Sequence, residues 1–238
     1  MSQTHSIHIV APTKPHPHTI ILLHGRDSTA QEFSSELFES QASDDRTLPE
    51  IFPSVKWGFP TSKLRMSQRF QTGLSQWFDI WSLEDPQEKL ELQVEELKES
   101  VEFIKSVVKE EVKIVGVENV ILGGTSQGCA TAIHALFHGN MKLGGFIDSA
   151  KNSLQLDEQI LAPFKNTTAR NPASATPMFL GHCIDDEVIS IKHGRALEQA
   201  LKGLGMEVQW REYEDDGHWL NEPEGVDDMA VFLEKIIG

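Results

Sequence analysis

Val120-Ile121-Leu122-Gly123-Gly124-Thr125-Ser126-Gln127-Gly128 is a short apolar run that ends in the pattern Gly-x-Ser-x-Gly. This spacing predicts a strand that turns sharply into a helix, because glycines at 124 and 128 remove the side chains that would collide in so tight a turn. Residues 129–137, which follow the motif, have the composition of a helix. We therefore expect the hydroxyl of Ser126 to be exposed at the edge of a sheet. A glycine-rich turn between two core elements is the alternative.

Apolar runs of strand length alternate with helical patterns along the rest of the chain. We expect further strands at residues 19–25, 55–60, 143–148, 177–182 and 206–213, and helices at 29–40, 86–111, 192–204 and 223–237. This alternation is typical of a mostly parallel sheet with helices on both faces, an α/β fold. The 238 residues fit a single domain spanning 1–238, with no large lid domain and with residues 1–17 only partly ordered.

The segment from Thr61 to Pro86 has little periodicity but is rich in large apolar side chains. It is interpreted either as a loop packed over the core or as one wall of a binding groove. For the groove, the candidate substrate-binding residues are listed here: Leu64, Met66, Phe70, Leu74 and Trp77.

Composition excludes several classes of partner. Acidic residues number 36 against 21 basic ones, for a net charge of −15. This balance argues against nucleic-acid binding and against electrostatic docking on an anionic membrane. No apolar run is long enough to span a bilayer or to serve as a signal peptide, so we expect a cytoplasmic protein without stable membrane insertion. The two cysteines, Cys129 and Cys183, have no metal-binding spacing, and we expect neither a metal nor a cofactor.

A serine hydroxyl needs a base to remove its proton, and that base is usually a histidine oriented by a carboxylate. Functional loops of parallel sheets gather beyond the carboxyl ends of the strands. His218 follows the last expected strand and is the preferred base. His24 and His182 also stand at strand ends and remain alternatives.

The acid is expected just after the preceding strand, where two carboxylates, Asp185 and Asp186, are adjacent. Position alone does not separate them. The order serine, aspartate, histidine is that of the α/β-hydrolase architecture. An anion pocket would then be formed by the backbone N–H of Gln127, at the start of its helix, and that of Arg26, in the loop after an early strand.

These residues resemble the acyl-protein thioesterase and carboxylesterase family, also called the phospholipase/carboxylesterase group. The resemblance extends from about residue 19 to the C-terminus, and its motifs are Leu23-His24-Gly25, Trp77-Phe78-Asp79, Gly123 to Gly128, and Gly217-His218. It implies that Asp186, four residues after His182, is the acid. The chain departs from the family pattern at Arg26-Asp27-Ser28, at Cys183, where glycine is usual, and at Glu187, where proline is frequent.

The resemblance implies a serine hydrolase without a metal that cleaves esters or thioesters of acyl chains, including chains carried on a protein, and that acts as a monomer or weak homodimer. A small-molecule carboxylesterase or lysophospholipase would use the same residues. Two further alternatives are a non-catalytic binding protein with a hydrolase fold and a metal hydrolase built on His182, Asp185 and Asp186.

Overall fold

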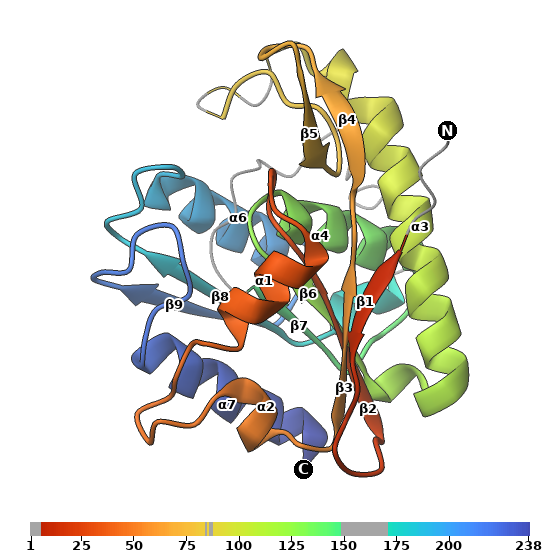
Figure 1. Cartoon of the computed structure of the whole chain (residues 1–238), viewed down its shortest axis with the longest axis vertical. Helices are drawn as coiled ribbons and strands as arrows, with labels where there is room; N and C mark the ends of the chain where they lie inside the picture. Colours follow the sequence, from red (N-terminus) through yellow and green to blue (C-terminus); the bar gives the residue numbers. More distant parts are fainter. Residues whose placement is uncertain (1–5, 84, 86–87, 149–170) are drawn as a thin grey trace.

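A seven-stranded sheet forms the centre of the protein, in the order β1-β3-β2-β6-β7-β8-β9 (Figure 1). The computed structural model describes residues 6–83, 85, 88–148 and 171–238. The strands of the sheet are β1 (Ile7–Val10), β2 (His18–Leu23), β3 (Val55–Pro60), β6 (Val120–Gly124), β7 (Gly145–Asp148), β8 (Met178–Cys183) and β9 (Val208–Tyr213). Every pair of neighbours is parallel except β1 with β3. The predicted mostly parallel sheet is confirmed.

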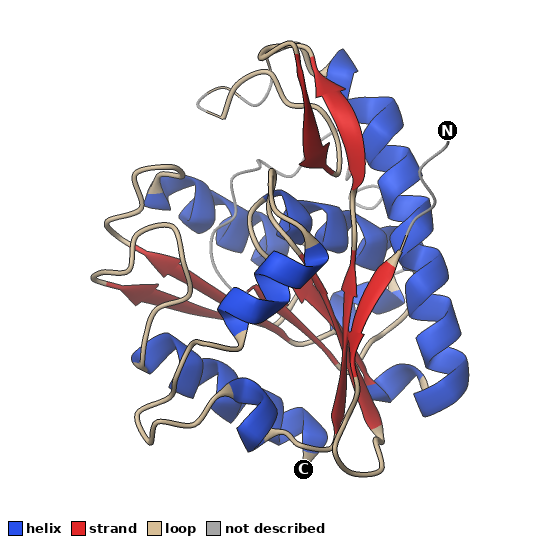
Figure 2. Ribbon diagram, viewed as in Figure 1, coloured by secondary structure: helices blue, strands red, loops and turns tan. Residues whose placement is uncertain are grey.

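Helices cover both faces of this sheet, as predicted (Figure 2). They are α1 (Ala30–Leu37), the short α2 (Leu48–Ile51), α3 (Glu91–Val115), α4 (Gln127–Gly139), α6 (Ile191–Gly203) and α7 (Glu224–Ile237). Alternate residues of β2 point to opposite sides, so Ile20 and Leu22 pack with α1, α2 and α7. Ile21 and Leu23 pack with α3, α4 and α6. Because β2 is buried on both faces, it has the continuous apolar sequence expected of a central parallel strand.

Two additional strand features were not predicted from the sequence. Strand β1 lies in the segment expected to be only partly ordered, and it extends the edge of the sheet by pairing Ile7 with Pro60 and Val10 with Trp57. Strands β4 (Lys63–Ser67) and β5 (Thr72–Gln76) form a separate antiparallel hairpin within the segment interpreted either as a loop over the core or as one wall of a groove. In Figure 1 the hairpin stands beyond the sheet, beside one end of α3.

Helix α3 is displaced from its predicted range of residues 86–111 by about one turn. Lys89 has a φ of +55°, which is incompatible with helix, and α3 begins only at Glu91. It ends at Val115 because Gly116 adopts a φ of +91°. Within the described part of the chain, no helix combines the length and the apolar character needed to cross a bilayer.

Candidate active site

Ser126 occupies the sharp turn between β6 and α4. Its φ of +51° and ψ of −125° are unusual for a residue other than glycine. A Cβ atom at Gly124 would lie 2.6 Å from the carbonyl oxygen of Leu23, and one at Gly128 would lie 2.3 Å from the same atom. Only glycine fits at either position, which explains the spacing of the motif in physical terms.

His218 and Asp186 form a hydrogen-bonded pair in the loops beyond β9 and β8. The Nδ1 atom of His218 lies 2.9 Å from Oδ2 and 3.0 Å from Oδ1 of Asp186. The Asp186 carboxylate is fully buried, while the imidazole is 29% exposed. The backbone N–H groups of Val188 and Ile189 each donate to Oδ1 of Asp186 at 2.9 Å. The two backbone bonds fix the carboxylate. Because Nδ1 of His218 faces this carboxylate, the other ring nitrogen, Nε2, is directed away from it.

The neighbouring carboxylate, Asp185, has a different partner. Its Oδ1 atom accepts a hydrogen bond of 2.9 Å from the N–H of Gly217, the residue before His218. Asp216 and Gly217 both have positive φ values, of 79° and 52°. Asp185 therefore holds the loop that carries His218, and Asp186 holds the imidazole itself. Sequence position placed both at this site but gave no means to assign the two contacts.

His182, one of the alternative bases, also lies beside Asp186. Its Nε2 atom is 3.0 Å from the carbonyl oxygen of Ile189 and 3.5 Å from Oδ2 of Asp186, and its side chain is 1% exposed. The position of His182 suits it to support the carboxylate rather than to meet a substrate.

The candidate anion pocket combines the start of α4 with the loop after β2. Gln127 is the first residue of α4, and the N–H groups of the next residues bond to the turn, that of Gly128 donating to Thr125 O at 2.8 Å. The first N–H groups of a helix lack intrahelical partners and favour negative charge. Arg26 lies in the other loop, which is held by a 2.7 Å bond from the N–H of Asp27 to Ser75 O.

A buried network below the pocket joins these two loops. The side chain of Gln127 accepts from the N–H of Trp77 at 2.8 Å and donates to the carbonyl of Phe78 at 2.7 Å. The indole N–H of Trp77 donates to the carbonyl of His24 at 2.8 Å. Gln127 thus has a positioning role through its side chain that the sequence did not reveal.

His24, the other alternative base, is committed to this network. Its Nε2 atom accepts from the N–H of Ser62 at 3.1 Å, and Nδ1 lies 2.7 Å from the carbonyl oxygen of Gly25. Burial lowers the pKa of His24 to about 4. The ring is therefore neutral near pH 7 and holds the Arg26 loop.

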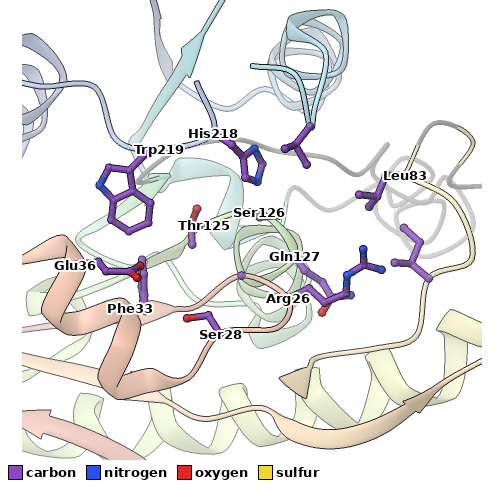
Figure 3. A pocket seen from close by; sticks show the side chains of 13 residues that line it. Arg26, Ser28, Phe33, Glu36, Leu83, Thr125, Ser126, Gln127, His218 and Trp219 are labelled. Carbon is purple, nitrogen blue, oxygen red and sulfur yellow. The ribbon is translucent and has the colours of Figure 1, made fainter. Parts of the chain in front are cut away.

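Ser126 and His218 open onto one cavity of about 270 Å³ (Figure 3). In Figure 3 the imidazole of His218 lies above Ser126 at the start of α4, with Arg26 and Leu83 to one side and Trp219 and Glu36 to the other. The complete lining is Gly25, Arg26, Ser28, Phe33, Glu36, Ile80, Leu83, Thr125, Ser126, Gln127, Val188, His218 and Trp219.

The candidate groove residues do not belong to this lining. Trp77 is fully buried, so the prediction that it contacts substrate is wrong: its indole is used to hold His24. Leu64 and Phe70, 60% and 52% exposed, stand on the β4–β5 hairpin and its turn, and Leu74 lies on β5. Met66, also on the hairpin, is 57% exposed. None of these four side chains is in the lining itself, but Phe70 packs against it: the guanidinium carbon of Arg26 lies 5.7 Å from the centre of the Phe70 ring.

Among the residues that the structure describes, no group of three or more His, Cys, Asp or Glu side chains has a geometry suited to a metal ion. Cys129 and Cys183 are both buried free thiols.

Comparisons with known proteins show the family of this chain. The phospholipase/carboxylesterase family model matches residues 4–237. The protein belongs to this family. It is 27% identical to acyl-protein thioesterase 1 of Gibberella zeae over 92% of the chain and 91% of the relative. The acyl-protein thioesterase 1 of Aspergillus fumigatus is also 27% identical, over 100% of the chain and 95% of the relative.

Comparison with solved structures supports the same fold. The crystal structure of Zea mays acyl-protein thioesterase 2 matches with a TM-score of 0.78 and 25% identity, covering 98% of this chain and 99% of the other. The Bacillus cereus carboxylesterase, with a TM-score of 0.70 and 16% identity over 99% and 96% of the two chains, shares the fold. The protein is therefore a hydrolase of the thioesterase and carboxylesterase type with an α/β-hydrolase fold.

Proposed function

We propose that Ser126 is the nucleophile of this hydrolase, His218 its general base and acid, and Asp186 the group that orients the imidazole. The observation that carries this proposal is that half-buried Ser126 and the Asp186-bound imidazole line one cavity. A hydrogen bond from Nδ1 to a buried carboxylate leaves Nε2 as the proton acceptor, which is the tautomer that the reaction needs.

The reaction follows in two steps. Ser126 attacks the acyl carbonyl while His218 takes its proton, and the backbone N–H groups of Arg26 and Gln127 stabilise the oxyanion. His218 then protonates the departing thiol or alcohol, which leaves an acyl-enzyme. Water repeats the sequence with the same base and releases the carboxylic acid.

The substrate we propose is an acyl thioester or ester, including acyl groups carried on a protein. The support is that several full-length relatives are named acyl-protein thioesterase 1. The predicted cytoplasmic location and the monomeric or weakly dimeric state suit such a substrate and stay predictions.

Replacing Ser126 by alanine tests the nucleophile. We expect Ser126→Ala to abolish turnover of p-nitrophenyl butyrate and of a matched butyryl thioester while the thermal unfolding midpoint stays within a few degrees. Ser106→Ala, on the exposed face of α3, is the control and should retain full activity. Residual turnover by Ser126→Ala near the rate of the unchanged protein would remove the assignment.

A small-molecule carboxylesterase is the second candidate, favoured by the modest size of the cavity, about 270 Å³. The two candidate functions are distinguished by measuring kcat/KM for acyl chains of two to sixteen carbons, as both thioesters and oxygen esters. A kcat/KM that rises with chain length and favours thioesters supports the acyl-protein thioesterase. A maximum at two to four carbons on oxygen esters supports the carboxylesterase.

A further inference from the structure

The cavity has two chemically different ends. On one side of Ser126 lie Arg26 and Leu83, and on the other lie Glu36 and Trp219 (Figure 3). Arg26 and Glu36 are the two lining residues that carry a fixed charge near pH 7, and they have opposite signs. The two parts of a bound ester would therefore meet different environments.

Trp219 is held rigidly at the second end. Its ring makes an edge-to-face contact with buried Phe33, with centroids 6.2 Å apart and planes at 86°. Its indole N–H donates to the hydroxyl of Ser40 at 3.3 Å. These two contacts fix the orientation of the indole, which remains half-buried at the edge of the cavity.

Glu36 adds a negative charge beside this aromatic pair. It follows Phe33 by three residues on α1, so both side chains lie on one face of the helix and both line the cavity. Among the described residues, the ion pairs found do not involve Glu36. The carboxylate is solvent-exposed at the rim and available to a ligand.

A carboxylate next to fixed aromatic rings is the arrangement that binds ammonium groups, through charge attraction and through the negative faces of the rings. The net charge of −15 increases the local concentration of cations further. This end of the cavity also adjoins His218, the residue before Trp219. Under the proposed function, His218 protonates the leaving group, so this end receives the thiol or alcohol part of the substrate.

We propose that Glu36 and Trp219 form a leaving-group subsite that selects esters and thioesters whose thiol or alcohol part carries a positive charge. This inference rests on the proposed function and specifies the substrate class. The residues act on specificity, because they contact a part of the substrate that is distant from the reacting carbonyl.

An isosteric pair of substrates tests the subsite. Acetylthiocholine and 3,3-dimethylbutyl thioacetate share an acyl group and shape, and they differ in the charge of the leaving group. We expect kcat/KM to favour the cationic thioester by about five- to ten-fold, and Glu36→Gln to bring the ratio close to one. Glu39→Gln removes a charge from an exposed position just beyond α1, outside the cavity lining, and should leave the ratio unchanged.

The outcomes distinguish a failure of the proposed function from a failure of the proposed subsite. If neither thioester is hydrolysed in a manner that depends on Ser126, the proposed function fails. If both are hydrolysed, and neither this pair nor the peptide pair described below shows a preference that Glu36→Gln removes, the function stands and the subsite is wrong. Because Glu36 is exposed, the glutamine variant is expected to fold.

The positive charge could belong to a small ammonium thiol or to a lysine beside an acylated cysteine. Two S-octanoyl-cysteine peptides that differ by lysine or norleucine at the neighbouring position distinguish these sources. A Glu36-dependent preference in the peptide pair assigns the subsite to protein substrates, and one confined to the thiocholine pair assigns it to small molecules. Absence of the preference in both pairs overturns the proposal.

Discussion

The buried residues that hold the active site differ sharply from the β4–β5 hairpin, although one of them, Trp77, directly follows the hairpin in sequence. The first set, which we call the buried frame, consists of His24, Trp77, Gln127 and Asp186, each less than a tenth exposed. The hairpin and its turn carry Leu64, Met66 and Phe70, each more than half exposed. Apolar residues within the segment 61–86 thus have two roles. Trp77 packs inside the protein and belongs to the frame, whereas the apolar residues of the hairpin are exposed.

The hairpin contacts α3 through charged side chains, and its strand β5 contacts the Arg26 loop through the bond from the N–H of Asp27 to Ser75 O. Lys63 and Arg65 both pair with Glu99 on α3, and these two bonds lower the pKa of Glu99 to about 2. The buried frame is held by hydrogen bonds that water does not reach. We therefore expect substitutions in the frame to have large effects and substitutions in the hairpin to have small ones.

The largest effect is expected at Asp186. Asp186→Asn should lower kcat by about 10³- to 10⁴-fold, because an amide no longer stabilises the imidazolium and can reverse the ring tautomer. The neighbouring change, Asp185→Asn, keeps an oxygen for the N–H of Gly217 and should lower kcat by less than about ten-fold. Steady-state kinetics on one p-nitrophenyl ester measures both. Equal losses in the two variants would contradict the separate roles assigned to the two carboxylates.

Trp77 is expected to give the largest loss of stability. Trp77→Ala removes a fully buried indole and should lower the free energy of unfolding by about 3–5 kcal/mol. Phe70→Ala, at a side chain 52% exposed, should change it by less than about 0.5 kcal/mol. Urea denaturation compares the two variants. If Phe70→Ala were as destabilising as Trp77→Ala, the division between frame and hairpin would be wrong.

Acid should weaken the protein through its buried histidines. Burial lowers the pKa of His24 to about 4 and that of His134 to about 3, from 6.5. Between these values and 6.5 the unfolded chain binds protons that the folded chain does not, so stability is full above about pH 6.5 and falls as the pH decreases. Each histidine contributes a slope of about 1.4 kcal/mol per pH unit.

Urea titrations between pH 4.5 and 6 measure this slope. His134→Leu, which removes a buried histidine on α4 away from the cavity lining, should reduce the slope by about 1.4 kcal/mol per pH unit. An unchanged slope in His134→Leu would show that the buried imidazole is not the source.

A small effect is also expected at Glu99. Glu99→Gln removes the charge that pairs with Lys63 and Arg65, but the carboxylate is 44% exposed and solvent screens the pairs. The free energy of unfolding should change by less than about 1 kcal/mol. A loss comparable to that of Trp77→Ala would mean that the hairpin is an integral part of the core.

The sequence predicted the central strands well because their signals are strong. Strands β2, β6 and β8 are buried throughout, so each is a continuous apolar run. Strand β1 is a short edge strand with half-exposed residues, and its existence depends on pairing with β3, which is distant in the sequence. In the hairpin Leu64 and Met66 do alternate with polar residues, a pattern typical of a strand. The alternation covers only the five residues of β4, and the rest of the segment has little periodicity.

In the candidate site, too, some features could be predicted from the sequence and others could not. The positions of Ser126, Asp186 and His218 relative to strand ends follow from local sequence and the order of elements. Contacts such as that between Trp77 and His24 join residues far apart in the chain, and only packing reveals them. Composition therefore suggested that Trp77 lines a groove, whereas the fold places it beneath the site.

Covalent labelling by a fluorophosphonate probe tests the central proposal most directly, because the probe requires both an activated serine and an anion pocket. Peptide mass spectrometry should find the phosphonyl group on Ser126 alone, with a labelling rate reduced by at least about 10³-fold in His218→Ala. Labelling of another serine, or an undiminished rate in His218→Ala, would contradict the assignment of Ser126 and His218 to one catalytic unit.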